Sequence, residues 1–152
     1  MKRSIVGFVL VMACASQANA EGGPFGLGIV VGTPTGLTGE YKLSSHTAID
    51  GALGVDLFFD RHLYVQGDFL FLFGDLLGGG SVGLTPYLGP GAFVADFGGR
   101  NGAGFGVRMP FGLSFDFTRA PLQIFVELSL NLELVHEVHF AIGGAVGFRY
   151  YF

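Results

Sequence analysis

The chain has 152 residues, a length that suits a single domain. Half of the residues are hydrophobic, 27 are glycine, and only 13% are charged. The 12 acidic residues outnumber the 8 basic ones, which excludes the basic surface that a nucleic-acid partner needs.

Residues 1–20 have the three parts of a secretory signal peptide. Lys2 and Arg3 form a positive start, residues 4–12 form an apolar stretch, and Ala18-Asn19-Ala20 forms a small-x-small cleavage site. The apolar stretch is much shorter than the roughly 20 residues that a membrane helix needs. We therefore expect the signal to be cleaved after export.

Cys14 offers an alternative interpretation of the same segment. It follows Val11-Met12-Ala13, which loosely resembles a lipoprotein cleavage box, although that box favours Leu at its first position. If the chain is instead cleaved after residue 20, the mature protein of residues 21–152 contains no cysteine. It then has no disulfide and no thiolate metal site. Residues 21–152 carry 6 basic and 12 acidic residues, because the first 20 residues hold two bases and no acid.

No apolar run of helix length follows residue 20. The longest plain apolar stretch, residues 69–73, spans five residues. High apolar content without a longer run is typical of a membrane β-barrel, in which lipid-facing and lumen-facing residues alternate along each strand.

From residue 25 onward, apolar side chains recur at every second position, which predicts β-strands. Eight strands are predicted, at residues 25–32, 37–43, 48–55, 63–73, 84–94, 105–117, 122–135 and 138–152. Turn-like segments separate them, at residues 33–35, 44–46, 60–62, 75–80, 98–101, 118–121 and 136–137. In the fifth strand Pro86 and Pro90 each remove a hydrogen-bond donor, so we expect a bulge or an irregular strand there.

The strand at 122–135 shows the clearest alternation. Every second residue from Leu122 to Leu134 is aliphatic. Such a row spans about 40 Å at roughly 3.3 Å per residue, and a tilt near 45° reduces its height to about the thickness of a bilayer. An even number of strands places both chain ends on the periplasmic side.

Alternation alone does not decide which face meets lipid, because a soluble lipocalin-type barrel alternates too. Volume decides between the two, since eight strands enclose a lumen that side chains just fill. The many Phe, Leu, Ile and Val residues of the apolar face would not fit inside it, whereas the other face is rich in Gly, Ala and Ser. The sequence therefore predicts an all-β fold, an eight-stranded antiparallel up-and-down transmembrane β-barrel.

The lumen-facing positions also carry charge. Nine charged residues have inward parity: Glu40, Lys42, Asp50, Asp68, Arg108, Asp116, Glu127, Glu133 and Arg149. Charges inside a narrow barrel must pair or become neutral. Six acids against three bases leave a surplus, so we expect carboxylates that are protonated or bind a cation. We interpret the network as a structural salt-bridge plug, with a polar path for ions or small solutes as the alternative.

Aromatic residues have two expected roles. With no Trp in the chain, tyrosines are expected to form the belts at the membrane interfaces: Tyr41, Tyr64, Tyr87, Tyr150 and Tyr151. The chain end, with Phe148, Tyr150 and Phe152, resembles the C-terminal signal by which the barrel assembly machinery recognises its clients.

Four segments carry a resemblance to known proteins: GTPTGLTG at 32–39, FGVRMPFGLSFDF at 105–117, APLQIFVE at 120–127 and GGAVGFRYYF at 143–152. They resemble a family of small, largely uncharacterised bacterial outer-membrane barrels, similar in architecture to the eight-stranded OmpA and OmpX type. The resemblance covers nearly all of residues 21–152. It implies a fold and an outer-membrane location, but no chemistry.

Catalysis and metal binding find little support. A Ser-His-Glu set is conceivable among the inward positions, which include Ser114, Ser129, His139, Glu127 and Glu133, but no spacing marks it. His136 and His139 are three apart and face opposite sides of a strand, so we expect no metal site there. We predict a protein that is not an enzyme and that has no cofactor.

Three functions remain in order of preference: a structural barrel with a plugged interior, a narrow pore for ions or small solutes, and a surface adhesin or partner-binding barrel. The outward loops are predicted at 33–35, 57–62, 97–101 and 135–137. All are short, which argues against the adhesin, because surface-binding barrels usually carry long loops. The expected partners are outer-membrane lipid and the assembly machinery.

Overall fold

The computed structural model describes residues 22–56, 61–96, 102–135 and 137–152. Within these ranges the chain forms nine β-strands, and no helix is long and apolar enough to cross a membrane. The strands are β1 (Phe25–Gly32), β2 (Thr35–Lys42), β3 (Thr47–Asp56), β4 (Arg61–Leu72), β5 (Val82–Leu88), β6 (Gly91–Asp96), β7 (Ala103–Phe117), β8 (Leu122–Glu133) and β9 (His139–Tyr151). The predicted signal peptide, including Cys14, lies outside the described residues.

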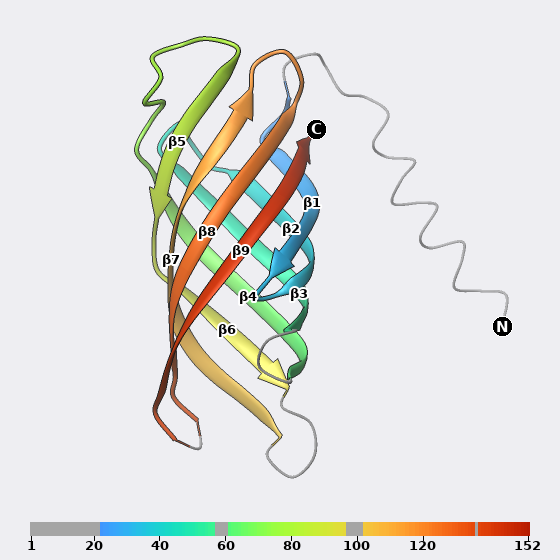
Figure 1. The fold of residues 1–152 in the computed structure, drawn as a ribbon, viewed down its shortest axis with the longest axis vertical. Helices are drawn as coiled ribbons and strands as arrows, with labels where there is room; N and C mark the ends of the chain where they lie inside the picture. Colours follow the sequence, from blue (N-terminus) through green and yellow to red (C-terminus); the bar gives the residue numbers. More distant parts are fainter. Residues whose placement is uncertain (1–21, 57–60, 97–101, 136) are drawn as a thin grey trace, which may run out of the picture.

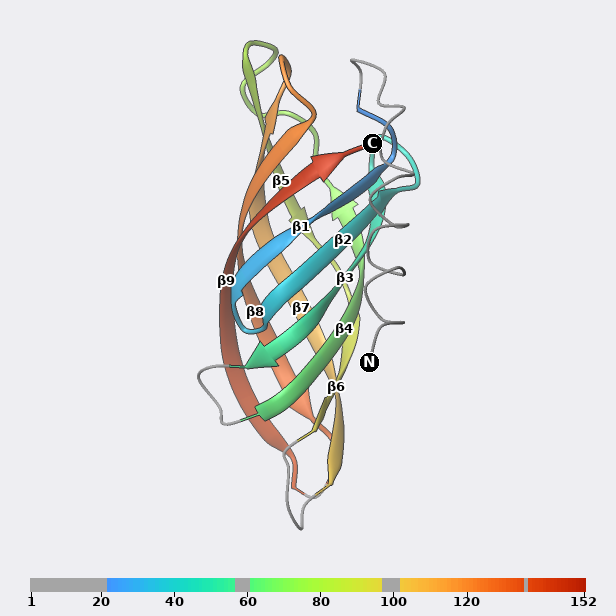
Figure 2. The ribbon, with the colours of Figure 1, turned by 90° about the vertical axis from the view of Figure 1, so that its right-hand side faces the viewer.

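The strands close into a barrel (Figures 1 and 2). Antiparallel pairing runs from β1 through β2, β3 and β4, and from β7 through β8 and β9, which pairs back with β1. β5 and β6 share one position, because both pair with β4 on one side and with β7 on the other. The barrel therefore has eight strand positions, and the predicted all-β, eight-stranded antiparallel barrel is confirmed.

The shared fifth position is interrupted where proline was expected to disturb it. β5 ends at Leu88 and β6 begins at Gly91, with Gly89 and Pro90 between them. Pro110 of β7 lies opposite this interruption, and its carbonyl accepts a hydrogen bond from the Gly89 N–H at 3.2 Å. Pro110, which lacks an N–H group, therefore faces the irregular segment that contains Pro90. The two prolines lie at the same interruption of the strand ladder.

Several predicted boundaries were wrong by one or two residues. Arg61 and His62 were predicted to lie in a turn but belong to β4, because the β3–β4 ladder continues through a register shift to the pair Asp56 and Arg61. β8 and β9 end slightly inside their predicted limits, as is common for strands next to a turn. The loop residues 57–60, 97–101 and 136 lie outside the described part of the chain.

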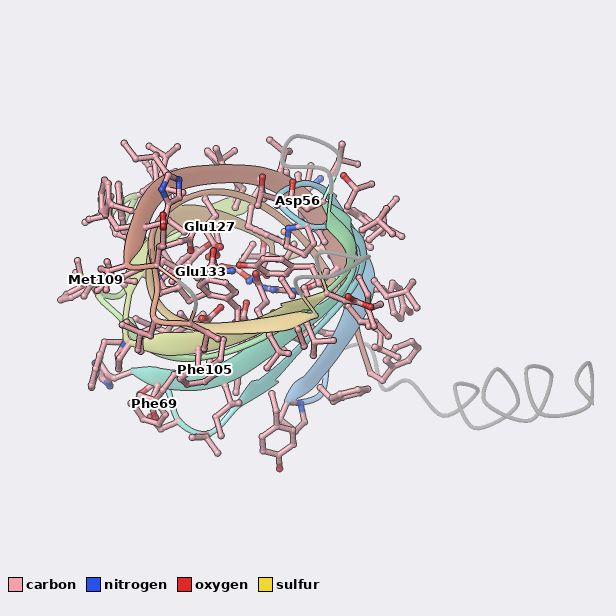
Figure 3. All side chains as sticks on the ribbon, turned by 90° about the horizontal axis from the view of Figure 1, so that it is seen from below. Asp56, Phe69, Phe105, Met109, Glu127 and Glu133 are labelled. Carbon is pink, nitrogen blue, oxygen red and sulfur yellow. The ribbon has the colours of Figure 1, made fainter. Side chains whose placement is uncertain are left out.

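Side chains alternate between two very different surfaces (Figure 3). Phe69, Phe105 and Met109 project outward, whereas Glu127 and Glu133 project into the barrel. Many large hydrophobic side chains of the outer face are well exposed, such as Ile29 at 58%, Leu128 at 48% and Ile142 at 62%. Several charged side chains of the interior are 5% exposed or less. This arrangement is the reverse of a soluble protein, in which apolar side chains are inside.

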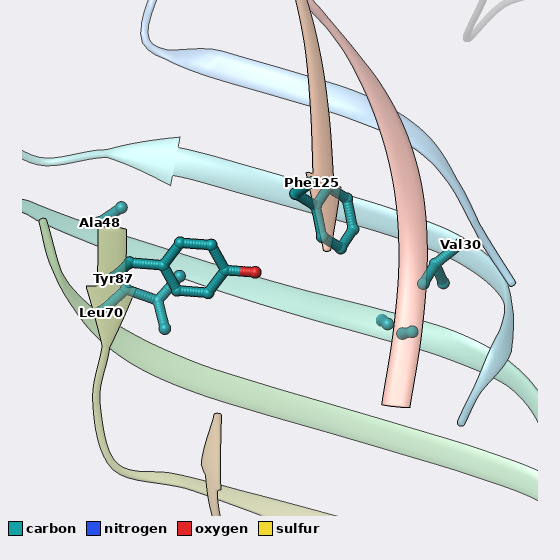
Figure 4. Packing of buried hydrophobic residues seen from close by; sticks show 7 residues of the cluster. Val30, Ala48, Leu70, Tyr87 and Phe125 are labelled. Atoms are coloured by element: carbon teal, nitrogen blue, oxygen red, sulfur yellow. The ribbon is translucent and has the colours of Figure 1, made fainter. Parts of the chain in front are cut away.

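Aromatic rings fill much of the interior. Four of them each lie over a glycine that is in register on the neighbouring strand: Phe125 over Gly147, Tyr87 over Gly112, Phe93 over Gly106 and Tyr151 over Gly26. A Cβ atom on any of these glycines would collide with the ring. Figure 4 shows Phe125 and Tyr87 in the larger interior cluster, together with Val30, Leu70 and Ala48. The rings and the glycines therefore fit a narrow lumen.

Candidate functional site

The candidate site is the charged interior of the barrel. Six of the nine predicted lumen residues are almost fully buried there: Glu40, Asp50, Asp68, Arg108, Glu127 and Arg149. Lys42 and Asp116 are half-buried near the end of the barrel that holds both ends of the described chain, and Glu133 is half-exposed toward the opposite end. The six buried residues form two clusters, each built around one arginine.

Arg149 of β9 holds the first cluster. Its Nη1 donates to Glu40 at 2.7 Å and its Nη2 donates to Asp50 at 2.6 Å. Nε and Nη2 also donate to the Thr38 hydroxyl, at 3.2 and 2.8 Å, and Nη1 donates to the Gln123 side chain at 3.2 Å. Every nitrogen of this guanidinium thus has a partner, which is what burial of a charge requires.

Arg149 reaches these partners across β1. Gly28 of β1 is in register with Arg149, so no side chain of β1 stands between β9 and β2 at this level. The guanidinium lies 4.1 Å from the centroid of the Phe125 ring, which supports it by a cation–π contact. The Tyr151 hydroxyl donates to the second oxygen of Glu40 at 2.6 Å and completes the cluster.

Arg108 of β7 holds the second cluster. Its Nη2 donates to one oxygen of Glu127, and the Tyr87 hydroxyl donates to the other oxygen at 3.0 Å. Its Nε lies 3.2 Å from Asp68 Oδ1 but is not aligned for a hydrogen bond. Its Nη1 has no hydrogen-bond partner within the described ranges. This guanidinium is therefore less well satisfied than that of Arg149.

A polar cavity of about 210 Å³ opens at the end of the barrel near the chain termini. Lys42 and Asp116 line it and form an ion pair at 3.5 Å, with about a third of each side chain exposed. Asp75, in the segment between β4 and β5, also lines it. Backbone N–H groups of Leu84, Leu77 and Gly79 donate to Asp75 and lower the pKa of its carboxyl group.

The conceivable Ser-His-Glu set is not assembled in the described part of the barrel. The Ser114 hydroxyl donates to Asp116, and the Ser129 hydroxyl accepts from the Asn131 amide deep inside. His139 is exposed at the start of β9, in register with Glu133. Neither serine therefore has the adjacent histidine base that a nucleophile needs.

The tyrosine prediction was wrong for three of the five residues. Tyr64, Tyr87 and Tyr151 are 5% exposed or less and fill the interior instead of forming belts. The reason is parity, because all three alternate with outward apolar residues. Tyr41 is exposed and Tyr150 is partly exposed, and the Tyr150 ring packs against Phe152 at a centroid distance of 5.0 Å.

The aromatic chain end lies on the strand that closes the barrel. β9 pairs with both β8 and β1, and the Phe152 N–H donates to the Phe25 carbonyl at 2.8 Å. Phe148 is exposed on the outer surface, and Tyr150 and Phe152 are partly exposed. The three residues thus lie where the first and last strands meet.

Comparison with known proteins leaves the family open. No protein-family model, no curated protein and no solved structure matches the chain. The barrel architecture expected from the OmpA and OmpX likeness is confirmed by the fold itself. Membership of the outer-membrane family stays a prediction.

Proposed function

We propose that the protein is a structural outer-membrane β-barrel whose outer wall faces lipid and whose charged interior is closed. The observation that carries the proposal is the reversed surface: exposed apolar side chains outside and buried ion pairs inside. Monomeric soluble proteins rarely expose apolar patches beyond a few hundred Å². Here apolar side chains line the outside of every strand position, from Phe25 to Phe148.

The height of the wall formed by the long strands β7 and β8 suits a bilayer. β7 has 15 residues and β8 has 12. At roughly 3.3 Å per residue and a tilt near 45°, strands of this length rise about 28–35 Å, close to the ~30 Å of a hydrocarbon core. Closure also supports the proposal, because a closed barrel leaves few unpaired backbone groups at its edges.

A closed interior is favoured over a pore by the burial of the side chains that cross it. Arg149 is 1% exposed, Phe125 is 2% exposed and Tyr64 is fully buried. The specific observation that favours a pore is the polar cavity at the terminal end. Its lining includes Tyr87 and Gln123, and both side chains are buried. We therefore place the pore second.

The export route supports the location. The predicted signal peptide and the aromatic end of β9 are both features of proteins that the barrel assembly machinery inserts into the outer membrane. These partners, like the membrane location, are expectations from sequence that the arrangement of residues on β9 fits.

Insertion into vesicles tests the proposal. The protein, refolded from denaturant with phosphatidylcholine vesicles, should float with them, resist alkaline carbonate extraction and migrate differently on gels before and after boiling. A protein that folds in buffer and stays in the soluble fraction would contradict the proposal. Planar-bilayer recording on the same sample separates the two functions, because a closed interior predicts no unitary conductance and a pore predicts reproducible steps.

A further inference from the structure

Three carboxylates occupy successive positions of one ring of residues around the barrel. Glu40 of β2 is in register with Asp50 of β3, and Asp50 is in register with Asp68 of β4. All three side chains point inward and are 5% exposed or less. Like charges directly opposite each other on neighbouring strands are destabilising, and burial increases the penalty. Each pair of facing carboxyl groups therefore needs a group between them that offsets their repulsion.

The gap between Glu40 and Asp50 is filled by an arginine. Arg149 donates with Nη1 to Glu40 and with Nη2 to Asp50 Oδ2, so one guanidinium bridges the two carboxylates. The next gap, between Asp50 and Asp68, has no such bridge. Asp50 and Asp68 are directly paired on neighbouring strands, and both carboxyl groups are buried in the lumen. Yet Asp50 Oδ1 and both oxygens of Asp68 receive no aligned donor from the described residues.

The other charged and titratable groups near this gap do not close it. Arg108 of β7 approaches Asp68 only with a misaligned Nε. Glu127 of β8 adds another negative charge, and the Tyr87 hydroxyl of β5 donates to Glu127. The six buried residues of the two arginine clusters thus count four carboxyl groups against two guanidinium groups. A net negative charge this deep requires a further positive charge or neutralisation.

We infer that Asp50 and Asp68 share one proton, held between Asp50 Oδ1 and Asp68. This proton bridges Asp50 and Asp68 as Arg149 bridges Glu40 and Asp50. One proton turns two facing acceptors into a donor and an acceptor. It thereby satisfies two buried oxygens at once and removes one like-charge contact. A metal ion is a poorer occupant, since no group of three His, Cys, Asp or Glu residues in the described ranges is placed to hold one.

Gly91 leaves space in the lumen wall for the Asp68 carboxyl group. It is in register with both Asp68 and Arg108, between their two strands. A Cβ atom at Gly91 would collide with Asp68 Oδ1, which lies over this glycine and 3.2 Å from Arg108 Nε. The absence of a side chain at Gly91 therefore lets the Asp68 carboxyl group stand between the strand of Asp50 and that of Arg108.

Infrared spectroscopy of the refolded barrel tests the inference. The wild type at neutral pH should show the C=O stretch of one protonated carboxyl group per chain, with the small shift in D₂O that an exchangeable proton gives. Asp68→Asn should remove this band and still fold, because an amide keeps a neutral donor facing Asp50. The control Asp116→Asn changes the half-exposed carboxylate paired with Lys42 and should leave the band unchanged.

Three results would overturn the inference. One is a wild-type spectrum without a protonated carboxyl band, which needs no variant to fold. Another is a band that survives in Asp68→Asn. The third is a thermal midpoint that depends strongly on sodium and is lost when sodium is exchanged for a bulky organic cation, which would assign the gap to a metal cation instead.

Discussion

Arg149 and Arg108 lie at the centres of two clusters of the same composition, an arginine with a glutamate, an aspartate and a tyrosine. The clusters differ in how the arginine meets its aspartate. In each, the arginine donates to a glutamate, and a tyrosine hydroxyl donates to the other oxygen of that glutamate. In each, an aspartate lies on the far side of the guanidinium. Arg149 meets its aspartate at 2.6 Å in good alignment, whereas Arg108 Nε meets Asp68 without a hydrogen bond.

The difference follows the closure of the barrel. The Arg149 cluster joins β9 to its neighbour β8 and, across Gly28 of β1, to β2 and β3, so it spans the seam between the first and last strands. The Arg108 cluster joins β7 to β4 and β8 beside the interrupted β5 and β6 position. The fully hydrogen-bonded guanidinium of Arg149 therefore lies at the seam between the first and last strands. The less fully hydrogen-bonded guanidinium of Arg108 lies beside the interrupted strand position.

The largest expected effect comes from removing the two arginines. Arg149→Met leaves Glu40 and Asp50 buried without a cation and should lower the free energy of unfolding by about 3–5 kcal/mol. Arg108→Met also leaves Glu127 and Asp68 buried without a cation, but it should cost less, about 1.5–3 kcal/mol, because it breaks one aligned hydrogen bond to a carboxylate instead of two. Urea unfolding of both variants in the same micelles measures the two losses. Equal losses, or a larger loss for Arg108→Met, would remove the distinction between the clusters.

A second effect comes from the ring that supports Arg149. Gly147→Ala places a methyl group against the Phe125 ring, which must move away from the guanidinium, and should cost about 1–3 kcal/mol. Gly144→Ala is the matched control on the same strand, because its nearest neighbour is a Leu128 methyl group at 3.5 Å. It should leave the unfolding midpoint nearly unchanged. Equal unfolding midpoints for Gly147→Ala and Gly144→Ala would show that the Phe125 ring does not fill the space over Gly147.

The two tyrosines give a smaller and more selective comparison. Tyr151→Phe removes a 2.6 Å hydrogen bond to Glu40, and Tyr87→Phe removes a 3.0 Å hydrogen bond to Glu127. Short hydrogen bonds to carboxylates are the stronger ones, so Tyr151→Phe should cost about 1.5–3 kcal/mol and Tyr87→Phe less. Both variants keep the ring, so the midpoints report the hydroxyl alone. A larger loss for Tyr87→Phe than for Tyr151→Phe would show that Glu127 relies on its tyrosine more than Glu40 does.

The smallest effect lies outside the barrel, at the exposed Asp75. Its pKa is lowered by backbone donors, so its contribution to loop order is present above the ordinary carboxyl range and is lost as pH falls through the lowered pKa. The protection factors of the Leu77, Gly79 and Leu84 amides, which are exchange rates corrected for their intrinsic pH dependence, should fall in acid in the wild type. In Asp75→Asn these protection factors should not change with pH. Wild-type protection factors that do not fall in acid would contradict this account of the loop.

Period-2 alternation predicted most of the fold, because burial in a barrel depends on parity alone. It placed the outward row of β8 and the inward charges, whereas the irregularity near Pro90 was predicted from the N–H groups that the prolines lack. It did not predict that Arg61 and His62 continue β4, since that depends on a register shift in the partner strand. Turn-like residues at a strand start give no sign of such a shift.

The site was predicted as a set of residues but not as two clusters. Parity shows that Glu40 and Arg149 point inward, but their contact requires β1 to present Gly28 between them. That contact depends on the register of three strands, which no single segment reveals. Thr38 and Gln123 were missed for the same reason, although both have inward parity. The tyrosines were misplaced because residue type was given more weight than parity.

The most direct test of the central claim, that the apolar face meets lipid, uses the absence of tryptophan from the chain. Leu128→Trp places a fluorophore on the outer face, where Leu128 is 48% exposed, and Phe93→Trp places one inside, where Phe93 is 2% exposed. In vesicles of brominated phosphatidylcholine, the Leu128→Trp emission should be strongly quenched and the Phe93→Trp emission should not. Quenching of the inner tryptophan alone, or of neither, would contradict the account.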